Sequence, residues 1–121
     1  MNKEYSENGA PLCECGEEHH HSFGGLKMPE TDILFGLSDF FKIFGDPTRL
    51  SILFALDNGE MCGCDLVELL GLTKAVISYQ LKVLERHDLV RSRKVGRRVI
   101  YSLSDEHVKD IIEKALDHIN E

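Results

Sequence analysis

Four side chains able to bind a metal ion lie in the last part of the sequence: Asp105, His107, His118 and Glu121. His118 and Glu121 are three residues apart, so on a helix they share one face. His107 and His118 are eleven residues apart, which separates them by about 16 Å along a straight helix. Because metal–ligand bonds are only about 2 Å long, one ion cannot reach both histidines on the same helix.

The spacing therefore predicts a site that two copies of the helix share. If all four side chains bind one ion, Asp105 and His107 come from one copy, and His118 and Glu121 come from a second, antiparallel copy. A two-fold axis provides this arrangement and creates two identical sites. Two imidazoles and two carboxylates in four-coordinate geometry suit zinc, and softer ions gain little from them. The pattern favours a homodimer whose interface helix also senses a metal ion.

The same segment, residues 105–121, has the apolar period of a helix. Its apolar residues recur at intervals of three and four positions, at Val108, Ile111, Ile112, Ala115, Leu116 and Ile119. This spacing places them on one face of a helix. We therefore expect a C-terminal helix with one apolar face.

The four cysteines form two C-x-C pairs, Cys13/Cys15 and Cys62/Cys64. The first residues lack the apolar region of a signal peptide, and no apolar run is long enough to span a bilayer, so we expect a cytoplasmic protein with reduced thiols. In that compartment the pairs indicate metal thiolates rather than structural disulfides. A redox-sensing dithiol is one alternative, and small buried core residues at positions 62 and 64 are another.

Cys62 and Cys64 can hold one ion only under a structural condition. Side chains at positions i and i+2 of a regular helix point about 200° apart. The pair can therefore chelate an ion only at the start of a helix, where the backbone is not yet helical. Gly59 ends the preceding segment and allows a new helix to begin there.

Charge is distributed unevenly along the 121 residues. The whole chain carries −7, yet residues 74–98 hold eight basic and two acidic residues and so carry +6. A basic segment on an acidic protein indicates local contact with phosphates, and a solvated charged face is the alternative. The basic residues are Lys74, Lys82, Arg86, Arg91, Arg93, Lys94, Arg97 and Arg98.

Length and local patterns predict one domain, residues 31–121, after a flexible N-terminal tail, residues 1–30, that contains Cys13, Cys15 and three histidines. A helix is expected from Thr31 to Phe44, a second from Asp46-Pro47 to Asp57, and a short third within residues 62–70. Gly71 and the cap Thr73 lead into a fourth helix that ends near residue 87.

The third and fourth predicted helices have the form of a helix-turn-helix, and residues 89–103 indicate a β-hairpin with a basic turn at residues 94–98. The predicted fold is therefore mainly α with a small β-hairpin, a winged helix-turn-helix. Within its fourth helix we expect four buried side chains, Val76, Ile77, Leu81 and Leu84.

Several motifs in this order resemble the ArsR/SmtB family of metal-sensing winged-helix repressors, over about residues 32–121. They are Gly45–Leu53 (GDPTRLSIL), Glu60–Leu66 (EMCGCDL), Ile77–Leu84 (ISYQLKVL), Gly96–Leu103 (GRRVIYSL) and the terminal D-x-H-x10-H-x2-E. The resemblance implies an obligate dimer through the N- and C-terminal helices. It also implies that the metal-free dimer binds operator DNA and that metal binding releases it.

The resemblance implies two metal sites and a DNA-reading surface. The interface site is Asp105, His107, His118 and Glu121, and the thiolate site is Cys62 and Cys64 with Cys13 and Cys15 as partners. A four-thiolate site suits cadmium, lead or zinc. We expect the interface site to regulate and the thiolate site to extend the response to softer ions; the reverse assignment is the alternative. The expected DNA-binding residues are Thr73, Lys74, Ala75, Ser78, Tyr79, Gln80, Arg97 and Arg98.

Two departures from the family pattern concern the DNA-reading surface. Lys74 and Ala75 replace a more common small polar pair, and Tyr79 stands where His is common. The operator sequence is therefore not predicted.

An enzyme is not expected, because no general base accompanies the ligands. A metal-buffering protein would not need the basic hairpin, and a thiol-redox-sensing repressor of the same fold is the remaining alternative.

Overall fold

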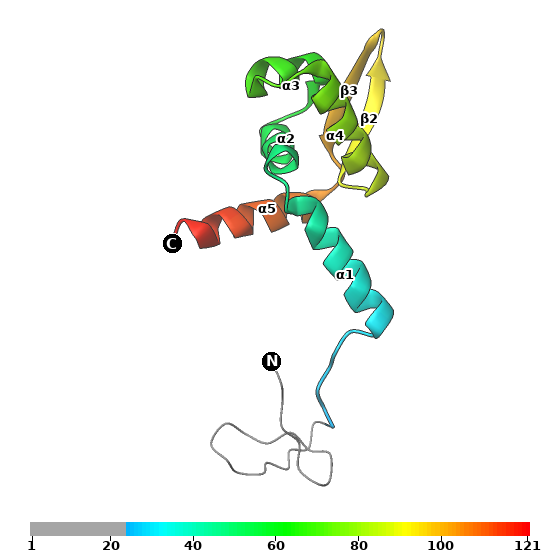
Figure 1. Cartoon of the computed structure of the whole chain (residues 1–121), viewed down its shortest axis with the longest axis vertical. Coiled ribbons are helices and arrows are strands. Elements are labelled where there is room, and N and C mark those ends of the chain that lie inside the picture. Colours follow the sequence, from blue (N-terminus) through cyan, green and yellow to red (C-terminus); the bar gives the residue numbers. More distant parts are fainter. Residues whose placement is uncertain (1–23) are drawn as a thin grey trace. The chain divides into compact units, whose positions relative to one another are not determined.

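The computed structural model describes residues 24–121, and residues 31–121 form one compact unit. Figure 1 shows its five helices and the hairpin formed by β2 and β3. The elements follow in the order α1 (Thr31–Phe44), α2 (Pro47–Asp57), β1 (Met61–Cys62), α3 (Gly63–Leu70), α4 (Lys74–Arg86), β2 (Val90–Val95), β3 (Arg98–Leu103) and α5 (Glu106–Ile119). The winged helix-turn-helix predicted from the sequence is confirmed.

Side-chain caps place the starts of two helices where the sequence indicates. The Asp46 carboxylate accepts a hydrogen bond from the Arg49 N–H at 2.9 Å, and Pro47 opens α2. The Thr73 hydroxyl accepts from the Val76 N–H at 3.1 Å at the start of α4. Between α3 and α4, Gly71 has a φ of 66°, a left-handed conformation that glycine adopts without strain. These caps fix the angle at which α4 leaves the turn.

The sheet has three strands in the order β1-β3-β2, and both pairs are antiparallel. Val95 pairs with Arg98, so the hairpin turn consists of Gly96 and Arg97. The sequence did not predict β1, because two residues give no alternating pattern. Its pairing of Cys62 with Ile100 joins the C-x-C segment to the wing.

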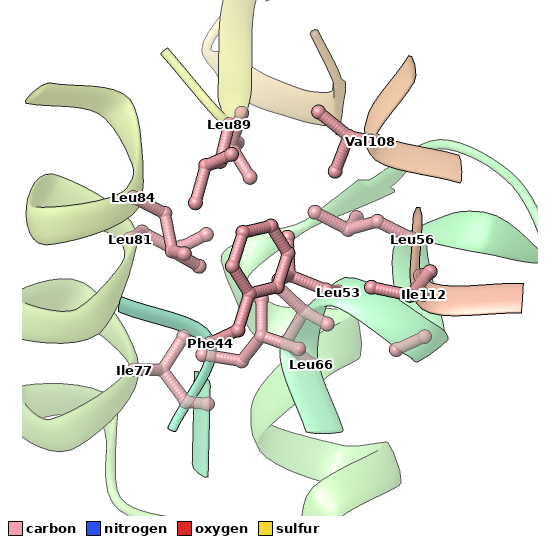
Figure 2. Close-up of a cluster of buried hydrophobic side chains, with 13 residues drawn as sticks. Phe44, Leu53, Leu56, Leu66, Ile77, Leu81, Leu84, Leu89, Val108 and Ile112 are labelled. Atoms are coloured by element: carbon pink, nitrogen blue, oxygen red, sulfur yellow. The ribbon is translucent and has the colours of Figure 1, made fainter. Parts of the chain in front are cut away.

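The core lies where α2, α3, α4 and α5 meet, with Phe44 from the end of α1 (Figure 2). Three of the four side chains expected to be buried in α4 are buried, namely Ile77, Leu81 and Leu84. The expectation for Val76 was wrong, since it is 39% exposed. Val76 lies about 100° around the helix from Ile77, which takes it off the stripe that faces the core.

Much of the apolar surface of α1 stays exposed within one copy of the chain. Phe44 is its one buried residue, whereas Ile33, Leu34, Phe35, Leu37 and Phe41 are exposed. Leu116 and Ile119 are exposed at the end of α5 as well. Contiguous apolar surface of this kind marks an interaction site. Among the described residues, no helix is long and apolar enough to cross a membrane.

Candidate metal sites and nucleic-acid interface

The four predicted interface ligands form two separate pairs: Asp105, the residue before α5, with His107, and His118 with Glu121, which follows the end of the helix at Ile119. Nδ1 of His107 lies 3.7 Å from Oδ2 of Asp105, and Nδ1 of His118 lies 3.6 Å from Oε2 of Glu121. Asp105 also caps the helix, because its Oδ1 accepts from the Val108 N–H at 3.2 Å. All four side chains are exposed to solvent. Each pair therefore presents one imidazole and one carboxylate on the surface.

The two pairs lie at opposite ends of α5, which has 14 residues. Within residues 24–121, no three His, Cys, Asp or Glu side chains gather closely enough to hold a metal ion. One copy thus places one imidazole–carboxylate pair at each end of the helix. Imidazole and carboxylate are donor types that suit zinc.

The electrostatics of Asp105 suit a ligand that is already ionised. The hydrogen bond from the Val108 N–H, and next the nearby His107, hold the pKa of Asp105 below its ordinary value. Its carboxylate therefore needs no deprotonation near neutral pH before it can bind a metal ion.

An ion pair that the sequence did not reveal joins α5 to α2. Nζ of Lys109 lies 2.9 Å from Oδ1 of Asp57, whose side chain is only 14% exposed, and 3.2 Å from Oε2 of Glu113. The hydrogen bonds to Asp57 and then Glu113 raise the pKa of Lys109 above its ordinary value. A shift of α5 would therefore act on the last residue of α2.

The C-x-C pair sits at the junction of β1 and α3, as its chelation requires. Cys62 is the residue before α3, with an extended backbone at φ −83° and ψ 166°, and Cys64 is the second residue of the helix. Both are free thiols; Cys62 is buried and Cys64 is exposed. Both line a groove of about 660 Å³ between α3, α4 and β3. Cys13, Cys15 and the three tail histidines lie outside the described residues.

The thiol of Cys62 has a charged neighbour that belongs to the wing. Nη2 of Arg98 donates to Cys62 Sγ at 3.4 Å and lies 3.8 Å from Oδ2 of Asp65. That carboxylate also accepts from the Cys62 backbone N–H at 3.1 Å. Hydrogen bonds that Asp65 accepts from the side chain and then the backbone of Cys62 are the largest causes that hold the pKa of Asp65 below its ordinary value, and the charge of Arg98 lowers it further. The thiol, Asp65 and Arg98 thus form one hydrogen-bonded group.

Most of the residues expected to read DNA lie on the exposed side of α4 and its N-terminus. Thr73, Lys74, Ala75, Ser78 and Tyr79 are all exposed. The hydroxyl groups and the Lys74 ammonium can bond to base edges or phosphates. The exposed positions belong to the first two turns of α4, which are the part of a recognition helix that enters a major groove.

Gln80 is placed differently from its neighbours on α4. It is half-buried, and its Oε1 accepts a hydrogen bond from Nη1 of Arg49 at 3.3 Å. Arg49 in turn donates through Nε to the Ile43 carbonyl at 2.8 Å. Gln80 thus links α4 to the junction of α1 and α2.

The wing presents Arg97 and Arg98 in two different ways. Arg97 lies in the turn and is exposed, whereas the guanidinium of Arg98 is held at Cys62 and Asp65. A third arginine, Arg93 on β2, forms an ion pair with Glu60 at 2.6 Å. The expected phosphate contact at the wing tip therefore applies most directly to Arg97.

Comparison with known proteins gives the following similarities. Residues 46–92 match the family described as "Bacterial regulatory protein, arsR family". A transcriptional repressor SmtB homolog from Synechocystis sp. is 39% identical over 85 residues, which cover 70% of this chain and 64% of that protein. A cadmium resistance transcriptional regulatory protein CadC homolog from Staphylococcus aureus is 40% identical over 82 residues, which cover 67% of this chain and 68% of that protein.

A solved structure supports the same relationship. The solution structure of apo-NmtR superposes with a TM-score of 0.66 at 31% sequence identity. The superposition covers 82% of this chain and 87% of that one. The similarity therefore includes the elements outside the segment of residues 46–92.

Proposed function

This chain belongs to the arsR family of bacterial regulatory proteins, which are DNA-binding transcriptional regulators and not enzymes, and we propose that it is a metal-responsive repressor. In this proposal the metal-free homodimer binds double-stranded operator DNA in the cytoplasm, and zinc binding releases it. The observation that carries the proposal is the division of four zinc-type ligands into two pairs at opposite ends of α5.

The exposed apolar residues of α1 and the end of α5 support the dimer. A second copy of the chain would bury these side chains and exclude water from them. They are Ile33, Leu37 and Phe41 on α1, and Leu116 and Ile119 on α5. Burial of apolar surface stabilises a complex by roughly 25 cal/mol per Å² before the losses on association are subtracted. An antiparallel pairing of α5 with its copy would bring His118 and Glu121 beside the other chain's Asp105 and His107.

In the dimer, Asp105 and His107 would hold zinc from one side and His118 and Glu121 from the other. Bound zinc supplies a rigid link between the two chains. Asp105 is already ionised and can bind zinc without losing a proton. An imidazole binds zinc only in its neutral form. Metal binding at such a site fixes the relative orientation of two α5 helices.

The orientation of α5 matters because DNA demands a fixed geometry of the dimer. The two α4 helices must lie about 34 Å apart to enter successive major grooves. The Lys109–Asp57 ion pair joins α5 to α2, which packs in the same core as α4. If zinc stabilises a dimer geometry in which the two α4 helices have another spacing, zinc weakens DNA binding. DNA binding then weakens zinc binding by the same factor.

Cys62 and Cys64 support a second, softer site in the same protein. Two free thiols line one groove, and thiolates favour ions such as cadmium, lead and zinc. Cys13 and Cys15 are the proposed additional ligands. In this proposal the thiolate site extends the response to ions that the α5 ligands bind poorly.

Operator binding measured by fluorescence anisotropy tests the proposal. The wild type, His118→Ala and Cys62→Ser are titrated onto labelled operator DNA without metal, with zinc and with cadmium. We expect zinc to weaken operator binding by the wild type and by Cys62→Ser, and to leave His118→Ala unaffected. Cadmium should act on His118→Ala but not on Cys62→Ser. An unchanged wild-type affinity with zinc would contradict the zinc-sensing function.

A matched test separates metal sensing from thiol oxidation. The same titration is repeated with the Cys62→Ser protein under reducing and oxidising conditions. If zinc still releases this variant from DNA, thiol oxidation is not required for the response. If release occurs only on oxidation of the wild type, the protein is a redox sensor and the metal-responsive proposal fails.

A further inference from the structure

One of the two thiols, that of Cys62, belongs to a strand of the sheet that forms the wing. Cys62 is the second residue of β1, and it pairs with Ile100 on β3, a strand of the wing. Glu60, just before β1, also contacts the wing through its ion pair with Arg93 on β2. A change at Cys62 therefore acts on the wing through the sheet itself, within one copy of the chain.

The guanidinium of Arg98 lies beside the sulfur of Cys62, in the groove that Cys64 also lines. It lies 3.4 Å from Cys62 Sγ and 3.8 Å from the Asp65 carboxylate. A metal cation bound to this sulfur would repel a guanidinium at that distance, because two like charges a few ångströms apart disfavour each other. The side chain of Arg98 is 64% exposed, so it can leave without disturbing the core.

We propose that Arg98 is the positioning residue that couples the thiolate site to the wing: its guanidinium holds Cys62 and Asp65 in the metal-free protein, and a soft metal ion at Cys62 displaces it. This inference rests on the proposed function of the thiolate pair. Arg98 lines the groove that Lys74, Ser78 and Arg97 also line, next to the start of α4. Its displacement would therefore change the distribution of positive charge beside α4.

The proposal predicts that Arg98 competes with the metal ion. Its removal should tighten metal binding by about two- to fivefold, the range expected for a partly exposed charge pair. Removal should also reduce the factor by which the metal weakens operator binding, because the link to the wing is lost. A Lys at position 98 keeps the charge but has no planar fork, so it should restore these properties only in part.

The experiment uses the full-length dimer and cadmium as the probe. Cadmium affinity is measured from the near-ultraviolet absorbance of cadmium–thiolate bonds for the wild type, Arg98→Ala and Arg98→Lys. The matched control is Arg93→Ala, which removes another arginine–carboxylate pair of the wing without touching Cys62. Thermal unfolding of each variant, followed by circular dichroism, confirms that it is folded. Operator affinity is then measured with and without cadmium.

We expect tighter cadmium binding in Arg98→Ala, an intermediate value in Arg98→Lys, and an unchanged value in Arg93→Ala. Unchanged or weaker cadmium binding in Arg98→Ala overturns the proposal, as does the absence of cadmium–thiolate absorbance in the wild type. If no metal alters wild-type operator binding, the proposed function fails separately. The cadmium affinities of the variants then still decide whether Arg98 competes at Cys62.

Discussion

The two candidate metal sites differ in where their ligands lie relative to the DNA-reading elements. The α5 pairs are exposed on a helix that begins after the wing and ends away from it (Figure 1). Cys62 and Cys64 instead lie where β1 meets α3, beside the wing and the start of α4. The α5 ligands are incomplete in one copy, whereas both described cysteines face one groove of one copy.

This contrast implies two routes from a metal ion to DNA. Zinc on α5 would act between the two copies of the chain. It would change the spacing of the two α4 helices without changing the structure of either copy. A soft ion at Cys62 would act within one copy, by changing the wing. The hardness of the ligands matches this division, since imidazole and carboxylate suit zinc and thiolate suits softer ions. In this proposal one fold would respond to two classes of ion through two different movements.

The largest effect is expected from His118→Ala, which removes one ligand from each interface site of the dimer. Zinc should weaken wild-type operator binding by about 5- to 150-fold, the usual range of allosteric coupling, and should leave the variant unaffected. His87→Ala is the control, because His87 is an exposed histidine after α4 that belongs to neither site. A zinc effect that persists in His118→Ala would mean that α5 is not the regulatory site.

The pH dependence separates imidazole from carboxylate ligands. The pKa of Asp105 is already below its ordinary value, so this group stays ionised as the solution is acidified from pH 8 to 5.5. Histidine side chains in general change charge between about pH 5 and 8, and a protonated imidazole cannot bind zinc. We therefore expect the zinc effect on operator anisotropy to fade as pH falls. A constant zinc effect would indicate that His107 and His118 are not ligands.

A smaller effect is expected at the ion pair that joins α5 to α2. Asp57→Asn removes the charge that faces Lys109, and Glu113→Gln is the control that leaves the Asp57 contact in place. Asp57→Asn should reduce the zinc-induced change in operator affinity by about two- to fivefold while zinc still binds. Equal coupling in both variants would show that the movement of α5 reaches α4 by another route.

The smallest effect is expected at Arg97, which lies in the wing turn and is exposed. Arg97→Ala should lower the slope of log affinity against log salt by about 1 and leave metal affinity unchanged. Arg98→Ala, in contrast, should change cadmium affinity. The variants of the two adjacent arginines therefore distinguish phosphate contact by the wing from coupling to the metal site. An unchanged salt slope in Arg97→Ala would show that the wing tip does not contact DNA phosphates.

The helical part of the fold could be predicted because its signals are local. Asp46-Pro47, Gly71 and Thr73 act within four residues of their own positions, and the structure confirms the helix starts and the turn that they indicated. Strand β1 could not be predicted, because its two residues are defined by a partner almost forty positions later in the chain. The prediction that Val76 is buried was wrong, because Val76 lies beside the apolar stripe of α4 that faces the core.

The candidate sites could be predicted only as lists of ligands. Periodicity predicted that Asp105, His107, His118 and Glu121 share one helix. The structure has two pairs, with Asp105 as the cap before α5 and Glu121 two residues beyond the helix end at Ile119. The roles of Arg98 and Gln80 depend on contacts with Cys62 and Arg49, which are 36 and 31 residues away, respectively. Such contacts follow from strand register and helix packing, which the local sequence does not specify.

Zinc binding by mixed dimers tests most directly the claim that two copies share each interface site. One variant carries Asp105→Ala and His107→Ala, and the other carries His118→Ala and Glu121→Ala; both also carry Cys62→Ser to remove the thiolate site. Each variant alone has only half of every site. Mixed dimers have one complete site and one without ligands. We predict that neither variant alone binds zinc tightly and that mixing restores one tight site per mixed dimer. Failure of mixing to restore any tight binding would contradict a shared site.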